Sequence, residues 1–106
     1  MGKVSRPKPI HLPEKLRQIR IALGLSQDGM LEHLGLAERS FRSAISGYER
    51  GEREPPLPIL LAYARAVGIS TDVLIDDEMD LPGKLMKAAK SAEVKRKHAL
   101  RTKRRR

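Results

Sequence analysis

The stretch from Gly24 to Pro55 constrains the fold of this chain most strongly, because it carries two short helical patterns joined by a turn. The first pattern opens at Ser26, a residue that caps helices well, and closes at Gly35. The second pattern is polar and basic on its outer face, and Gly51 ends it. No alternating strand pattern is found along the chain, so we expect an all-α fold.

Further helical patterns flank this stretch, each with apolar residues at intervals of three or four. They predict a first helix from Pro13 to Leu23 and a fourth from Leu57 to Val67, followed by a short fifth helix after Ser70. The third helix is expected from Ser40 to Arg50, with Ser40 as its cap. The predicted architecture is therefore a five-helix domain.

Charge divides the chain unevenly. Residues 84–106 carry eleven Lys or Arg and one acid, a net charge of +10, whereas residues 1–83 have a net charge of −1. We therefore expect a proline-rich flexible arm at residues 1–11, a folded domain at 12–80 and a basic tail at 81–106 that is partly helical or disordered. The tail has two interpretations: a solubilising run, or an arm that adds sequence-independent contacts to phosphates. Without an aromatic residue, it is poorly suited to stacking on single-stranded bases.

Several classes of function are disfavoured. The chain has no cysteine and no apolar run long enough to span a bilayer, so we expect a cytoplasmic protein without membrane contact. Its three histidines are isolated from one another, and the acidic run at residues 76–80 lacks the spacing of a calcium loop. We interpret that run as a solvated domain end, and we expect no metal, no cofactor and no enzymatic activity.

The order of motifs resembles the phage-repressor and Cro-like (XRE-type) helix-turn-helix family. The resemblance covers about residues 12–77. It is carried by these segments: Leu16 to Arg20, Leu23 to Gln27, Leu34-Gly35, Ile45-Ser46, Glu49 to Gly51, Pro55, and Leu60 to Val73. It implies a five-helix, lambda-repressor-like domain that binds operator DNA as a dimer, with the third helix in the major groove.

The resemblance also assigns roles to individual residues. The positions expected to face bases are Arg42, Ser43, Ser46 and Gly47. Those expected to contact phosphates are Ser26, Gln27, Arg39, Arg50 and Arg53. Arg20 and Glu49 match a partly buried ion pair between the first and third helices. Among the base-facing residues, Arg42 is the best reader, because arginine can donate two hydrogen bonds to one guanine.

The chain departs from the family pattern in three places. The interval from Gly35 to Ile45 is about four residues longer than usual, so the turn is longer or the third helix begins earlier, near Glu38. Leu31 stands where a small residue is common. Gly47 stands where a longer polar side chain is common, and a glycine there would let the backbone approach DNA closely.

Three functions follow as alternatives. The first is a sequence-specific regulator that binds double-stranded DNA as a homodimer and acts as a repressor by occlusion. The second is an antitoxin that binds a toxin protein and regulates its own gene. The third is a basic protein associated with the nucleoid or with RNA, which would bind without sequence preference and with strong salt dependence.

Overall fold

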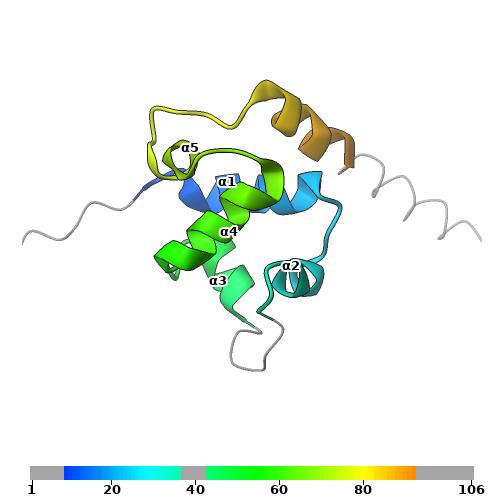
Figure 1. Ribbon diagram of the computed structural model, residues 1–106, viewed down its shortest axis with the longest axis vertical. Helices are drawn as coiled ribbons and strands as arrows, with labels where there is room; N and C mark the ends of the chain where they lie inside the picture. The colour runs from blue at the N-terminus through cyan, green and yellow to red at the C-terminus, as the bar shows by residue number, and fades with distance from the viewer. Residues whose placement is uncertain (1–8, 37–42, 93–106) are drawn as a thin grey trace, which may run out of the picture.

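A computed structural model describes residues 9–36 and 43–92, and this part of the chain forms helices without any strand (Figure 1). The helices in chain order are α1 (Leu12–Ala22), α2 (Gln27–His33), α3 (Ala44–Glu49), α4 (Leu57–Val67), α5 (Thr71–Ile75) and a further helix at residues 83–92. The prediction of a small all-α domain is confirmed. We refer to the last element as helix 83–92.

Local signals account for several of the helix starts. The hydroxyl of Ser26 accepts a hydrogen bond of 2.9 Å from the amide of Gly29, and the hydroxyl of Ser70 accepts one of 3.2 Å from the amide of Asp72. Each bond satisfies an amide that has no partner within its own helix. A proline lies at the first or second position of both α1 and α4, where its missing amide hydrogen costs nothing.

The end of α3 shows why a glycine is needed there. Gly51 has a φ of 76°, a left-handed conformation that L side chains rarely adopt. Its amide donates to the carbonyl of Tyr48 at 3.2 Å, and the amide of Glu52 donates to that of Gly47 at 2.9 Å. This is the Schellman arrangement, which satisfies carbonyls at the end of a helix.

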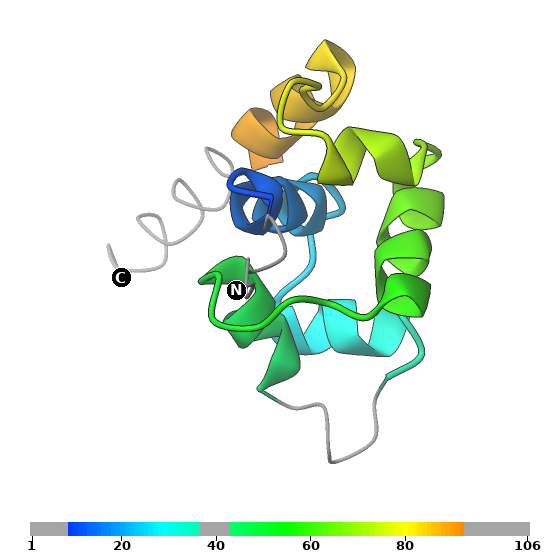
Figure 2. The same ribbon diagram turned by 90° about the vertical axis from the view of Figure 1, so that its left-hand side faces the viewer.

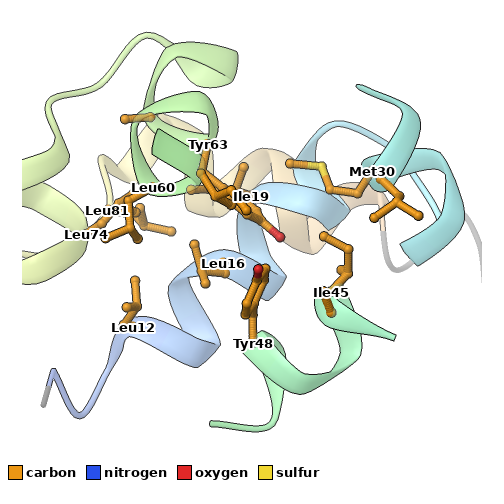
Figure 3. Packing of buried hydrophobic residues seen from close by; sticks show 14 residues of the cluster. Leu12, Leu16, Ile19, Met30, Ile45, Tyr48, Leu60, Tyr63, Leu74 and Leu81 are labelled. Atoms are coloured by element: carbon orange, nitrogen blue, oxygen red, sulfur yellow. The ribbon is translucent and has the colours of Figure 1, made fainter. Parts of the chain in front are cut away.

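Helix α1 lies at the centre of the domain and packs against α3, α4 and α5 (Figures 1 and 2). The largest fully buried side chains come from all five labelled helices: Leu16, Ile19, Met30, Ile45, Tyr63 and Leu74. Figure 3 shows them in one cluster around α1. Because α1 contacts α3 directly, packing in the core sets the position of α3.

A clasp between the beginning and the end of the domain was not predicted. The buried ammonium of Lys15 donates to the carbonyls of Val73, Asp76 and Met79 at 2.7, 3.0 and 2.7 Å. The carboxylate of Asp77 accepts bonds of 3.0 Å from the amides of Ile10 and His11. Our interpretation of the acidic run as only a solvated domain end is therefore corrected at Asp77, which holds the chain just before α1.

The core continues past the expected domain end at residue 80. Leu81 is 3% exposed and belongs to the central cluster, and Leu85 packs against that cluster. Ala89 is also buried, at 5% exposure. Helix 83–92 therefore packs on the domain through one apolar side, although the sequence places it in the basic tail.

Candidate nucleic-acid interface

The start of α2 and the end of α3 are held together by a network of polar side chains. Arg20 on α1 donates to both carboxylate oxygens of Glu49, with Nε to Oε2 at 2.7 Å and Nη2 to Oε1 at 3.1 Å. Its Nη1 also donates to the carbonyl of Leu25 at 2.9 Å, just before α2. Gln27, the first residue of α2, donates from Nε2 to Oε1 of Glu49 at 3.2 Å. One arginine and one carboxylate thus fix the relative positions of three helices.

The ion pair of Arg20 and Glu49 is shielded from water, since the two side chains are 10% and 5% exposed. Removing one partner of such a pair leaves a buried charge without compensation and costs about 3–5 kcal/mol. The sequence resemblance implied this pair, and the structure shows its geometry. Gln27 was expected only to contact phosphate. Its bond to Glu49 forms because packing brings α2 close to α3, and no local sequence signal predicts that contact.

The outward side of α3 and the loop after it carry polar and basic groups. Ser43 is exposed and Ser46 is half-buried, and both were expected to face bases. Arg50 is exposed and donates from Nη2 to Oε1 of Glu52 at 2.9 Å, an exposed ion pair of little energetic value. Arg50 can therefore leave Glu52 for another anion at low cost.

Gly47 does not offer the open backbone that we expected. The residue is buried, and a Cβ atom placed on it would lie 3.1 Å from Cδ and 3.3 Å from Cγ of Arg53. The aliphatic stem of Arg53 therefore covers Gly47, and the missing side chain makes room for that stem. Arg53 and not Gly47 provides the outer surface at this point.

The start of α3 also differs from the prediction. Ser43 precedes α3 at the cap position, with φ −95° and ψ 1°, and its side chain makes no capping hydrogen bond. The predicted third helix included Ser43, whereas α3 begins at Ala44. The predicted cap, Ser40, lies outside the described residues.

Comparison with known proteins agrees with this geometry. The family described as Helix-turn-helix matches residues 16–74, which include α1 to α4 from Leu16 onward and most of α5. The chain belongs to the XRE-type helix-turn-helix family. The resemblance noted in the sequence is thereby confirmed.

Two curated relatives from Bacillus subtilis (strain 168) are similar to this helix-turn-helix chain. One is the uncharacterized HTH-type transcriptional regulator YobD, 34% identical over 62 residues, or 58% of this chain and 52% of the relative. The other is the SPbeta prophage-derived uncharacterized HTH-type transcriptional regulator YonR, with the same identity over 62 residues and 54% of its length covered. The chain spans about half the length of these relatives. No solved structure matches it significantly.

Two predicted contacts of the helix-turn-helix domain, Arg39 and Arg42, belong to residues 37–42 and lie outside the described part. Ser26 and Gln27 are both exposed at the start of α2. Of the predicted positions in the described part, the structure thus brings Gln27, Arg20 and Glu49 into one contact network, with Arg50 adjacent in sequence.

Two tyrosines lie behind the helix-turn-helix surface. Burial, and next the negative charge of Glu49, raise the pKa of Tyr63 far above its ordinary value. Burial also raises the pKa of Tyr48 on α3, and the nearby positive charge of Arg53 opposes this effect. Both hydroxyls therefore stay neutral at physiological pH, and both side chains are buried in the core.

The described residues hold neither a metal-ligand cluster nor a helix that could span a membrane. Residues 9–36 and 43–92 contain no cluster of three or more His, Asp or Glu side chains suited to a metal ion. None of the helices in that part is long and apolar enough to cross a bilayer.

Proposed function

We propose that this chain is a transcriptional regulator that binds double-stranded DNA, with α3 in the major groove and the start of α2 on the phosphates. One observation carries the proposal: the hydrogen bond from Gln27 to Glu49 joins the exposed start of α2 to the end of α3. Phosphate and base contacts would then come from one continuous surface, as helix-turn-helix binding requires. Family membership and the names of the two relatives support the same function.

We assign each predicted contact residue a role that fits its position on this surface. Ser26 and Gln27 would contact phosphate through their exposed side chains, and Arg50 would leave Glu52 to do the same. Ser43 and Ser46 would tolerate several bases, whereas Arg42 would prefer guanine. Arg53 takes over the surface above Gly47, so we assign it to the DNA backbone.

A single domain with one strongly selective side chain would discriminate weakly between sequences. We infer that two copies bind a palindrome as a homodimer, with half-sites about 34 Å apart, or one turn of DNA. Binding over a promoter would repress transcription by occlusion. The exposed polar face of the domain and the net charge of +9 of the whole chain fit a cytoplasmic protein that meets DNA there.

Selection of bound duplexes from a random library, at roughly physiological salt, tests the proposal. A palindrome with half-sites about one turn apart is the expected result. Equal recovery of all sequences would overturn the regulator function and would favour the basic, sequence-independent binder.

Arg42→Ala is the sharpest variant for base reading. We expect a loss of about 1–3 kcal/mol in binding to the selected site and relaxed preference at one base position. Arg65→Ala is the matched control, because Arg65 is exposed on α4 and is not among the predicted contacts. Equal selectivity of Arg42→Ala and the wild-type protein would remove Arg42 from the interface.

Binding of a protein partner, as an antitoxin does, is favoured by one separate observation. An open groove of about 400 Å³ is lined largely by apolar residues, among them Leu12, Pro55, Leu57 and Ile75, and Leu57 is 75% exposed. Co-purification of an untagged chain with a second small protein, lost in Leu57→Lys, would support this candidate. Recovery of the chain alone from its native host would count against it.

A further inference from the structure

Helix 83–92 carries a stripe of lysines on its outer side. Lys84, Lys87 and Lys90 are spaced three residues apart, so they follow one another along one face of the helix, and all three are exposed. None of them forms an ion pair with another described residue. No acid lies within residues 83–92, so this face is uniformly positive.

The other face of the helix is fixed to the domain. Ala89 is buried, and Leu85 packs against the core next to Leu81. The segment leading to the helix is itself held at Met79, whose carbonyl accepts a bond from Lys15. The three lysines therefore lie on a helix that is packed on the domain, so the orientation of the lysine stripe relative to the domain is fixed.

Helix α1 lies between helix 83–92 and the proposed DNA surface. Figures 1 and 2 both show helix 83–92 on one side of α1, with α2 and α3 on the opposite side. A helix with its side chains is about 10 Å across, which exceeds the reach of a lysine side chain. The lysine stripe therefore cannot share the phosphates beside the groove that α3 would enter.

The chemistry of the stripe suits a duplex backbone. Ammonium groups bind phosphates as point charges without reading bases, and no aromatic residue in 83–92 could stack on an unpaired base. The apolar side of the helix is already covered by the core, which leaves little to insert into a lipid surface. Once the protein is bound to one site on a DNA molecule, other segments of that DNA are present near the protein at high effective concentration.

We propose that helix 83–92 binds the phosphates of a second segment of duplex DNA, so that one protein bridges two segments. The role of α3 in holding the first segment rests on the proposed function above. The residues after 92 contribute eight more basic residues and one acid in sequence, which adds to the attraction.

A capture experiment with the full-length chain tests this inference. One duplex carrying the selected site is immobilised and saturated with protein, and a fluorescent duplex of unrelated sequence is then added over a range of salt concentrations. We expect the wild-type protein to capture the second duplex. In K84Q/K87Q/K90Q we expect capture to weaken by about tenfold or more, and the slope of log affinity against log salt to fall by about 2.7.

Two controls accompany the variant. K84R/K87R/K90R keeps the charges and should retain capture. Binding of the glutamine variant to the immobilised site alone should stay within about twofold of the wild-type value, because the stripe faces away from that duplex. Glutamine favours helix about as well as lysine does, so the fold should be unaffected.

Three outcomes would overturn the inference: no capture by the wild-type protein, equal capture by the glutamine variant, or an equally large loss in binding to the first duplex. Much stronger competition by double-stranded RNA than by DNA would replace it with an RNA surface. Repeating the assay with an unrelated immobilised duplex separates the two proposals. Capture that persists without any preferred sequence would sink the regulator function and leave the second surface intact.

Discussion

At the scale of single residues, the hydroxyl of Tyr63 is a buried polar group that lacks a hydrogen-bond partner in the described part of the chain. The side chain is fully buried, and its hydroxyl has no hydrogen-bond partner among the described residues. A buried polar atom without a partner costs about 1–3 kcal/mol of desolvation. The ring, by contrast, fills the middle of the core (Figure 3).

Tyr63→Phe should therefore keep the free energy of unfolding unchanged or raise it by up to about 1 kcal/mol. Urea denaturation followed by circular dichroism measures this value. Tyr63→Ala is the control, and it should lose about 3–5 kcal/mol because it removes the ring. A loss above about 1 kcal/mol in Tyr63→Phe would show that the hydroxyl has a partner, such as a buried water.

Arg20 and Glu49 show how much one residue pair can be foreseen. They are 29 positions apart, and neither periodicity nor capping connects them. Only the resemblance to a known family suggested the pair. Its bidentate geometry, and the additional bond from Gln27, depend on how α1, α2 and α3 pack.

At the scale of elements, the short helix α3 depends on its glycine terminus. Helices of this length are unstable alone, so their ends and their packing must hold them. In α3, whose bounds are Ala44 and Glu49, the turn at Gly51 returns two amides to the helix carbonyls. A Cβ atom there would meet only an ordinary contact, at 3.4 Å from Cγ of Pro13, so the backbone conformation is the main constraint.

Gly51→Ala should lower the free energy of unfolding by about 1–2 kcal/mol, since an L residue is strained at a φ of 76°. Gly83→Ala is the matched control, because it places the same Cβ atom in open space without a positive φ. It should change stability by less than about 1 kcal/mol, in the favourable direction. Similar effects of the two substitutions in chemical denaturation would contradict this account of the turn.

At the scale of the whole molecule, the clasp of Lys15 and Asp77 joins segments that are distant in sequence. Asp77 bonds to amides 66 and 67 positions away, and Lys15 bonds to carbonyls after α5. The amides of Ile10 and His11 lower the pKa of Asp77 below its ordinary value. The folded protein therefore holds this carboxyl deprotonated at pH values where the unfolded chain begins to protonate it.

The sign of the pH effect follows. A lowered pKa in the folded state contributes stability that is complete above the unfolded pKa, about 3.9, and is lost as the pH falls through the folded value. Asp77→Asn should therefore be less stable than the wild-type protein at pH 7, and the difference should shrink below about pH 4. Urea midpoints measured from pH 2.5 to pH 7 check this, with Asp80→Asn as the control for loss of one charge. A difference that stays constant across this range would exclude the carboxylate as the cause.

Local chemistry in the sequence determined the helical class, most helix ends and the family. A serine cap or a glycine terminus acts within one turn, so residues such as Ser26, Ser70 and Gly51 could be interpreted in isolation. Gly47 could not, because its meaning depends on the stem of Arg53, which returns over it after the turn. No sequence signal marks the role of Lys15, because only packing brings three carbonyls around its ammonium. The direction of the lysine stripe was likewise decided by which side of α1 the last helix covers. These features needed the tertiary structure because each joins groups that are brought together only when the core closes.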